Sequence, residues 1–177
     1  MSFARCLLDD EAVETICTTL KYLPNIETLD FSHCNLSVIG AESIANMVKH
    51  QKIQRFSESW QRSLRYCAIN HETIPGLVNI SLNFNPGVGD EGLLLLLEIL
   101  KEDAWIKKIE MRGCRLTELG ANQISECLKI NNTITIFDIT KNPDISNAMY
   151  RCIAVQLGSD ESSLDGEPLK LSTSQFL

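Results

Sequence analysis

The chain has 177 residues, a formal net charge of −7 at pH 7, and 44% hydrophobic and 22% charged residues. These values are ordinary for one globular domain, and the acidic balance makes nucleic acid a poor expected partner. The longest apolar run, residues 93–97, is too short to cross a bilayer, so we expect no membrane segment. Seven cysteines without a Cys-x-x-Cys pair predict reduced thiols in the cytoplasm and no metal site.

Residues 1–25 contain only the second half of a structural unit. Cys6, Ala12, Ile16 and Leu20 keep a spacing that later parts of the chain repeat, but the strand that should precede Cys6 is missing or degenerate. The chain therefore either begins inside a longer array of units or has an unusual cap. We favour the first, because a terminal unit needs a polar outer face and Phe3, Leu7 and Leu8 do not provide one.

A complete unit is clearest in residues 106–128. Ile109 and Met111 are two residues apart and share one face of a short strand, Cys114 turns the chain, and a helix with an apolar stripe follows. This order is the leucine-rich-repeat signature L-x-x-L-x-L-x-x-N/C-x-L. Further copies begin at three other positions, namely Ile26, Leu77 and Ile134.

The spacing of the copies predicts the architecture. The starts at Leu77, Ile106 and Ile134 lie 29 and 28 residues apart, a period that leaves room for a full helix in each unit. One unit cannot bury its own apolar face, so the units must stack to form a core. We predict an α/β leucine-rich-repeat solenoid of the ribonuclease-inhibitor-like type, with a curved parallel sheet of four main strands inside and helices outside.

An inserted segment at about residues 50–76 interrupts this period. Ile53, Phe56, Trp60 and Leu64 recur at helical spacing, and the polar residues around them are mostly basic. We interpret the segment as a basic amphipathic helix followed by a loop. Its stripe either packs on the edge of the solenoid or binds a partner, because Trp and Arg are common interface anchors. The candidate partner-binding residues here are Arg55, Trp60, Arg62, Arg65 and Tyr66.

A second candidate surface is the concave face of the predicted sheet, where the central column reads Asp30, Ser81, Glu110 and Asp138. Glu110 and Asp138 lie on adjacent strands and could form an acid/base pair. No nucleophile, metal set or water-excluding lid accompanies them in the sequence, so we favour a solvated acidic groove over an acid/base pair. Such a groove can still bind a basic segment of a partner. Basic residues that would ease its charge are Lys108, Arg112 and Lys141.

The domain boundaries follow from the repeats. Residues 1–157 form the leucine-rich-repeat domain with its insertion. Residues 158–177 are rich in serine, glycine and acidic residues, and we expect them to form a flexible acidic tail.

The repeats and the insertion resemble the leucine-rich-repeat domain of the 78-kDa centrosomal protein family across residues 6–157. The most specific match is E-x-W-x-x-S-L-R-Y at residues 58–66, and others are N-x-N at 83–85, D-x-W at 103–105 and D-I-x-K-N-P at 138–143. The resemblance implies a non-enzymatic, cofactor-free adaptor of the centrosome, centriole and ciliary base, linked to ciliogenesis and centriole regulation. It implies centrosomal or ubiquitin-ligase proteins as partners.

Two other functions use the same kind of scaffold. A Ran-type GTPase-activating protein would need an Asn/Arg site on a loop, which the sequence does not locate, and stimulated GTP hydrolysis would establish it. An inhibitor of the ribonuclease-inhibitor type would wrap a basic enzyme, usually with more repeats than the sequence contains.

Overall fold

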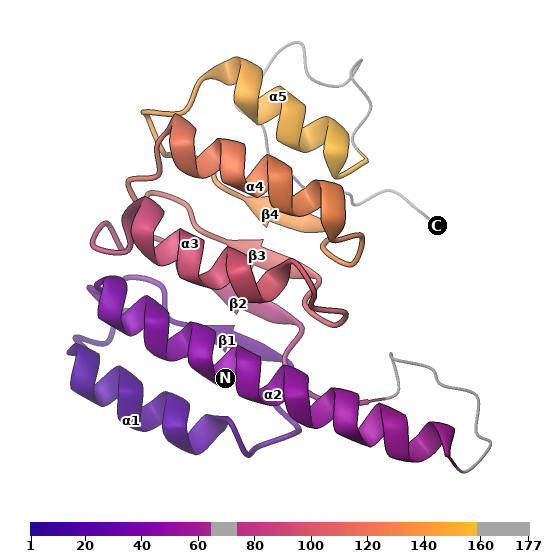
Figure 1. Cartoon of the computed structure of the whole chain (residues 1–177). Coiled ribbons are helices and arrows are strands. Elements are labelled where there is room, and N and C mark those ends of the chain that lie inside the picture. The colour runs from indigo at the N-terminus through magenta and orange to yellow at the C-terminus, as the bar shows by residue number, and fades with distance from the viewer. Residues whose placement is uncertain (65–73, 159–177) are drawn as a thin grey trace, which may run out of the picture.

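The computed structural model of the chain describes residues 1–64 and 74–158 (Figure 1). Arg65, Tyr66 and almost all of the expected acidic tail lie outside the described residues. Strands and helices alternate along the chain, with these bounds: α1 Asp10–Leu20, β1 Thr28–Asp30, α2 Val38–Ser63, β2 Asn79–Ser81, α3 Gly89–Leu100, β3 Lys108–Glu110, α4 Glu118–Ile130, β4 Ile136–Asp138 and α5 Asn147–Gln156.

The four strands form one parallel sheet in the order β1-β2-β3-β4, and the helices stack in the same order along one side of it (Figure 1). The register places the same repeat position in line on every strand, so Leu29 pairs with Ile80, Ile80 with Ile109 and Ile109 with Phe137. All four side chains are buried. The predicted leucine-rich-repeat solenoid is therefore confirmed, and its core runs continuously through the repeats.

The N-terminal residues supply the strand-like segment that the sequence analysis judged missing or degenerate. Ser2 forms a parallel bridge with Asp30, and the Phe3 backbone N–H donates to the Asp30 carbonyl at 2.7 Å. The ring of Phe3 stacks on Phe31 with centroids 5.1 Å apart. The segment is degenerate because one aromatic ring replaces the usual row of apolar anchors, which explains why the repeat pattern did not reveal it.

The turn after each strand is held by a buried cysteine or asparagine. The Cys114 thiol donates to the Leu82 carbonyl at 3.1 Å, as expected of a turn residue that satisfies backbone groups. Burial raises the pKa of the Cys114 thiol to about 11. It likewise raises the pKa of Cys17, a buried residue of α1, to about 12. Cys6, which occupies the equivalent place in the first unit, is exposed. It lies in the first unit that the structure describes.

The largest departure from the expected fold lies in α2. We expected a repeat helix followed by a separate inserted helix, but α2 runs for 26 residues without a break. Its C-terminal part, residues 52–63, extends past the ends of the neighbouring helices, and we call it the α2 extension (Figure 1). Among the described residues, no helix is both long and apolar enough to span a membrane.

Candidate protein-interaction surfaces

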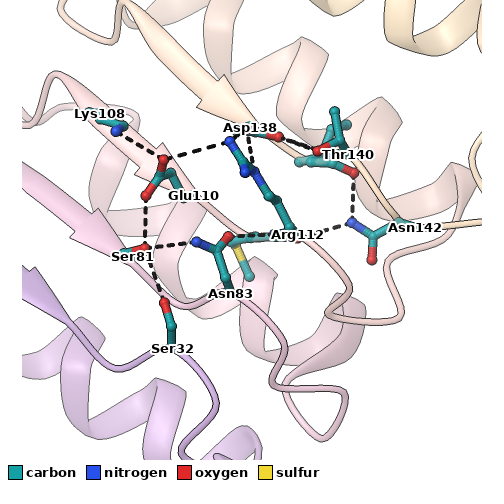
Figure 2. A network of polar contacts seen from close by, with 11 residues as sticks. Ser32, Ser81, Asn83, Lys108, Glu110, Arg112, Asp138, Thr140 and Asn142 are labelled. Carbon is teal, nitrogen blue, oxygen red and sulfur yellow. Dashed lines mark hydrogen bonds and ion pairs between the residues drawn. The ribbon is translucent and has the colours of Figure 1, made fainter. Parts of the chain in front are cut away.

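The predicted concave column is present on the sheet. Asp30 pairs in register with Ser81, Ser81 with Glu110 and Glu110 with Asp138, so the four side chains lie in a row across the strands. Ser81 donates to the Glu110 carboxylate at 2.8 Å and shares a hydrogen bond with Ser32 at 3.2 Å. Figure 2 shows this chain of polar contacts running from one strand to the next.

Basic side chains neutralise much of the acidic charge in this column (Figure 2). Lys108 Nζ lies 2.9 Å from the Glu110 carboxylate, and Arg112 Nε donates to Asp138 at 2.6 Å. The hydrogen bond to Asp138 is also the main cause that raises the pKa of Arg112. Lys141, which we expected to ease the same charge, lies over the ring of Phe84 instead.

Asp30 and Asp138 are held in different ways. Burial acts to raise the pKa of Asp30, but hydrogen bonds from Ser32 and Ser2 lower it overall, so the carboxylate stays ionised. Asp138 is buried and also accepts from the Thr140 backbone and hydroxyl. These contacts make Asp138 a structural group and leave Asp30 and Glu110 as the more accessible carboxylates of the column.

The structure shows how the apolar stripe of the insertion is placed, which the sequence left open between packing on the solenoid and binding a partner. Ile53, Phe56, Trp60 and Leu64, which we call the outer stripe, are all exposed, Trp60 to 67% and Leu64 to 65%. Among the described residues, only Phe56 of the stripe has an aromatic neighbour, packing edge-to-face on Trp105 with centroids 4.8 Å apart. Apart from this contact of Phe56, the outer stripe is largely exposed.

The buried face of the α2 extension is polar. Arg55 is only 6% exposed, and its guanidinium donates to the carbonyls of Pro75 at 3.0 Å and Leu77 at 2.9 Å. It also lies over the ring of Trp105, 5.4 Å from the centroid. Gly76 leaves room for it, because a Cβ there would collide with the guanidinium. Arg55 thus fixes the chain after the insertion and is not available on the surface to a partner.

Of the other basic candidates, Arg62 is half-buried and pairs with Glu58 one helical turn away, at 2.6 Å. Of the arginines predicted around Trp60, Arg55 is therefore removed from the surface by burial, Arg62 stays partly exposed in an ion pair, and Arg65 lies outside the described residues. The α2 extension thus exposes aromatic and aliphatic side chains, while Arg62 beside them is engaged in an ion pair with Glu58.

Sequence reasoning did not predict the contacts among three residues that lie shortly after the strands, namely His33, Phe84 and Lys141. His33 stacks on Phe84, and Lys141 reaches the same ring from the other direction. The only signal in the sequence was that Gly113 stands at the equivalent position of the repeat between Phe84 and Lys141.

Comparison with known proteins gives the same picture of the fold and adds relatives. Residues 22–45 match a family model described as Leucine Rich repeat. The fold is similar to a solved structure of the Leiomodin-1 Actin-Binding Site 2, with a TM-score of 0.65 and 11% identity, over 92% of this chain and 81% of that one. At this identity the likeness concerns the fold alone.

Three curated relatives are similar over most of the chain. The Cep78 homolog of Drosophila melanogaster is 48% identical over 89% of this chain and 19% of the relative. The 78-kDa centrosomal protein of mouse is 34% identical over 94% of this chain and 21% of the relative. The human protein of the same name is 35% identical over 86% of this chain and 22% of the relative. The chain thus spans about a fifth of the length of these relatives. Their names agree with the centrosomal localisation expected from the resemblance.

Proposed function

Because the chain resembles the leucine-rich-repeat region of the 78-kDa centrosomal proteins along most of its length, we propose that it is a non-enzymatic protein-interaction module of the centrosome and ciliary base. In this role it links partner proteins during centriole assembly and ciliogenesis. Centrosomal and ubiquitin-ligase components are the partner classes that the resemblance implies.

A binding role fits the chemistry of the concave column better than catalysis does. Glu110 and Asp138 are each engaged by a cation, through Lys108 and Arg112, so neither carboxylate is poised to move a proton. The same ion pairs reduce the negative charge that an inhibitor of a basic enzyme would offer. Within residues 1–64 and 74–158, no group of three or more His, Cys, Asp or Glu side chains could hold a metal ion.

The observation that carries the proposal is the outer stripe. Four large, exposed apolar side chains continue a repeat helix past its neighbours, and only Phe56 of them contacts the aromatic Trp105 among the described residues. Such a set forms the kind of surface that marks a protein interface. Their spacing of three, four and four residues matches the seam of a helix that packs on another helix. The partner segment is accordingly an amphipathic helix of another protein, packed along the α2 extension with Trp60 as the central anchor.

The test compares matched exposed side chains on and off the stripe. Tagged 177-residue chains carrying Trp60→Ser or Leu64→Ser should lose most of their signal at centrioles in dividing cells, and should label fewer centrosomal proteins in proximity labelling. Ile39→Ser and Leu119→Ser serve as controls, because these residues are 59% and 72% exposed on helices but lie outside the stripe. Equal behaviour of stripe and control variants would contradict the proposal for this surface.

A further inference from the structure

Five residues occupy the same position in successive repeats, each three residues after the register position on its strand. They are Arg5, His33, Phe84, Gly113 and Lys141, and we call them the edge column. They lie at the carboxyl ends of the parallel strands, an edge where open α/β sheets bind ligands. All five have a positive φ, between 58° and 63°.

Three of these side chains form a ladder around the ring of Phe84. The His33 ring stacks on the Phe84 ring with an interplanar angle of 17° and centroids 4.4 Å apart. Lys141 Nζ lies 5.1 Å from the centroid of the Phe84 ring. Gly113 stands between Phe84 and Lys141 in the column and leaves the space open, since a Cβ there would come within 2.9 Å of Phe84 Cδ1. The lysine can therefore reach across the intervening repeat.

The backbone of the ladder is held in a conformation that its residues do not prefer. His33, Phe84 and Lys141 carry a Cβ and are disfavoured in the left-handed region, where glycine is the usual choice. Strained positions that line up across repeats are typical of binding surfaces that the fold holds ready. In this protein the strained positions place the rings of His33 and Phe84 and the side chain of Lys141 on one edge of the sheet.

The charges along this edge favour an anionic ligand. Arg5, Arg115 and Lys141 are exposed, and none forms an ion pair within the described part of the chain. Three acids at the neighbouring helix starts are engaged by hydroxyl groups: Asp10 accepts from Ser37, Asp90 from Thr117 and Glu118 from Ser146. Asp9, which caps α1, and Asp144 are the exposed acids nearest in the sequence to Arg5 and Lys141, so three cations stand against two acids.

We propose that the edge column binds an extended acidic peptide segment of a partner protein. Its carboxylates pair with Arg5, Arg115 and Lys141, and its aliphatic stems lie against His33 and Phe84. The four strand steps from Arg5 to Lys141 span roughly 19 Å, which about six residues of extended chain would cover. This surface is separate from the outer stripe and rests on the proposed function only in that the chain binds proteins.

The experiment is a fluorescence-polarisation titration of the full chain with a labelled hexaglutamate peptide. Hexaglutamate should bind and hexaglutamine should not, and the affinity should fall as salt is raised. Lys141→Gln should weaken binding by about five- to tenfold. Gly113→Ala should weaken it to a similar extent, because the added methyl group separates Lys141 from Phe84, and circular dichroism should show that both variants stay folded.

Lys101→Gln is the matched control, because Lys101 is also an exposed lysine but lies at the end of α3. Equal losses for Lys101→Gln and Lys141→Gln would overturn the proposal, as would equal binding of hexaglutamine. A hexathymidylate oligonucleotide that binds as tightly would show a general anion surface and would also overturn it. None of these results touches the test of the outer stripe, so the two proposals can fail separately.

Discussion

At the scale of single residues, the asparagine turns join one repeat to the next more firmly than the cysteine turns do. Asn85 is fully buried and accepts from the backbone N–H groups of Cys34 at 3.0 Å and Leu36 at 3.1 Å. Its amide also donates to the carbonyls of Phe31 and Leu82, each at 2.9 Å. The Cys114 thiol contacts the carbonyls of Leu82 at 3.1 Å and Arg112 at 3.6 Å, and sulfur is a weaker hydrogen-bonding group than an amide.

This difference predicts unequal costs of truncation. Asn85→Ala should lower the free energy of unfolding by about 2–4 kcal/mol, because it leaves several buried backbone groups without partners. Cys114→Ala should cost only about 0.5–1.5 kcal/mol, since a thiol is a weak donor. Urea denaturation of both variants measures the difference, with Asn142→Ala expected to behave like Asn85→Ala. Equal losses for the asparagine and cysteine variants would show that the side-chain volume matters and the hydrogen bonds do not.

At the scale of elements, α2 shows what periodicity can and cannot predict. The spacing of Ile53, Phe56, Trp60 and Leu64 correctly indicated a helix. It did not indicate which way the stripe faces, because an apolar pattern defines a face but not its surroundings. The helix is continuous, so its first half fixes the rotation, and the buried face continues through Gln51, Arg55 and Ser59.

The arginine on that face should matter for stability and not for recognition. Arg55→Met keeps the aliphatic stem but removes the hydrogen bonds to the Pro75 and Leu77 carbonyls. We expect a loss of about 1–3 kcal/mol in the free energy of unfolding. Amide hydrogen exchange should also become faster in residues 52–63 than in the rest of α2.

Gln54→Met is the control for this prediction, because Gln54 lies on the same helix but is exposed. It should change the free energy of unfolding by less than about 0.5 kcal/mol. If Arg55→Met leaves both stability and exchange unchanged, then Arg55 does not fasten the α2 extension to the chain that follows it.

At the scale of the whole molecule, repetition made most of the fold predictable. Once one repeat was recognised, the parallel order, the register and the buried strand anchors followed, because every repeat stacks in the same way. The concave column was predictable for the same reason. The repeat pattern does not predict which neighbour a long side chain contacts. The sequence therefore did not show that Lys141 contacts Phe84 while Arg112 binds Asp138.

The continuous core leads to a prediction about how damage spreads. Ile109 is buried on β3, with Ile80 and Phe137 as its register neighbours on the two sides. Ile109→Ala should lower the free energy of unfolding by about 2–5 kcal/mol, because it leaves a cavity in the middle of the stack. Since repeats contact only their neighbours, amide protection should fall in the repeats before and after β3 as well.

The comparison that isolates this effect is Ile153→Ala, in the last described helix. Ile153 is as deeply buried as Ile109, but α5 packs on α4 and has no described helix on its other side. Its truncation should therefore speed exchange mainly in residues 118–156 and leave the first repeats protected. If Ile109→Ala speeds exchange only in residues 106–128, or leaves the midpoint of thermal unfolding unchanged, then the repeats do not share one cooperative core.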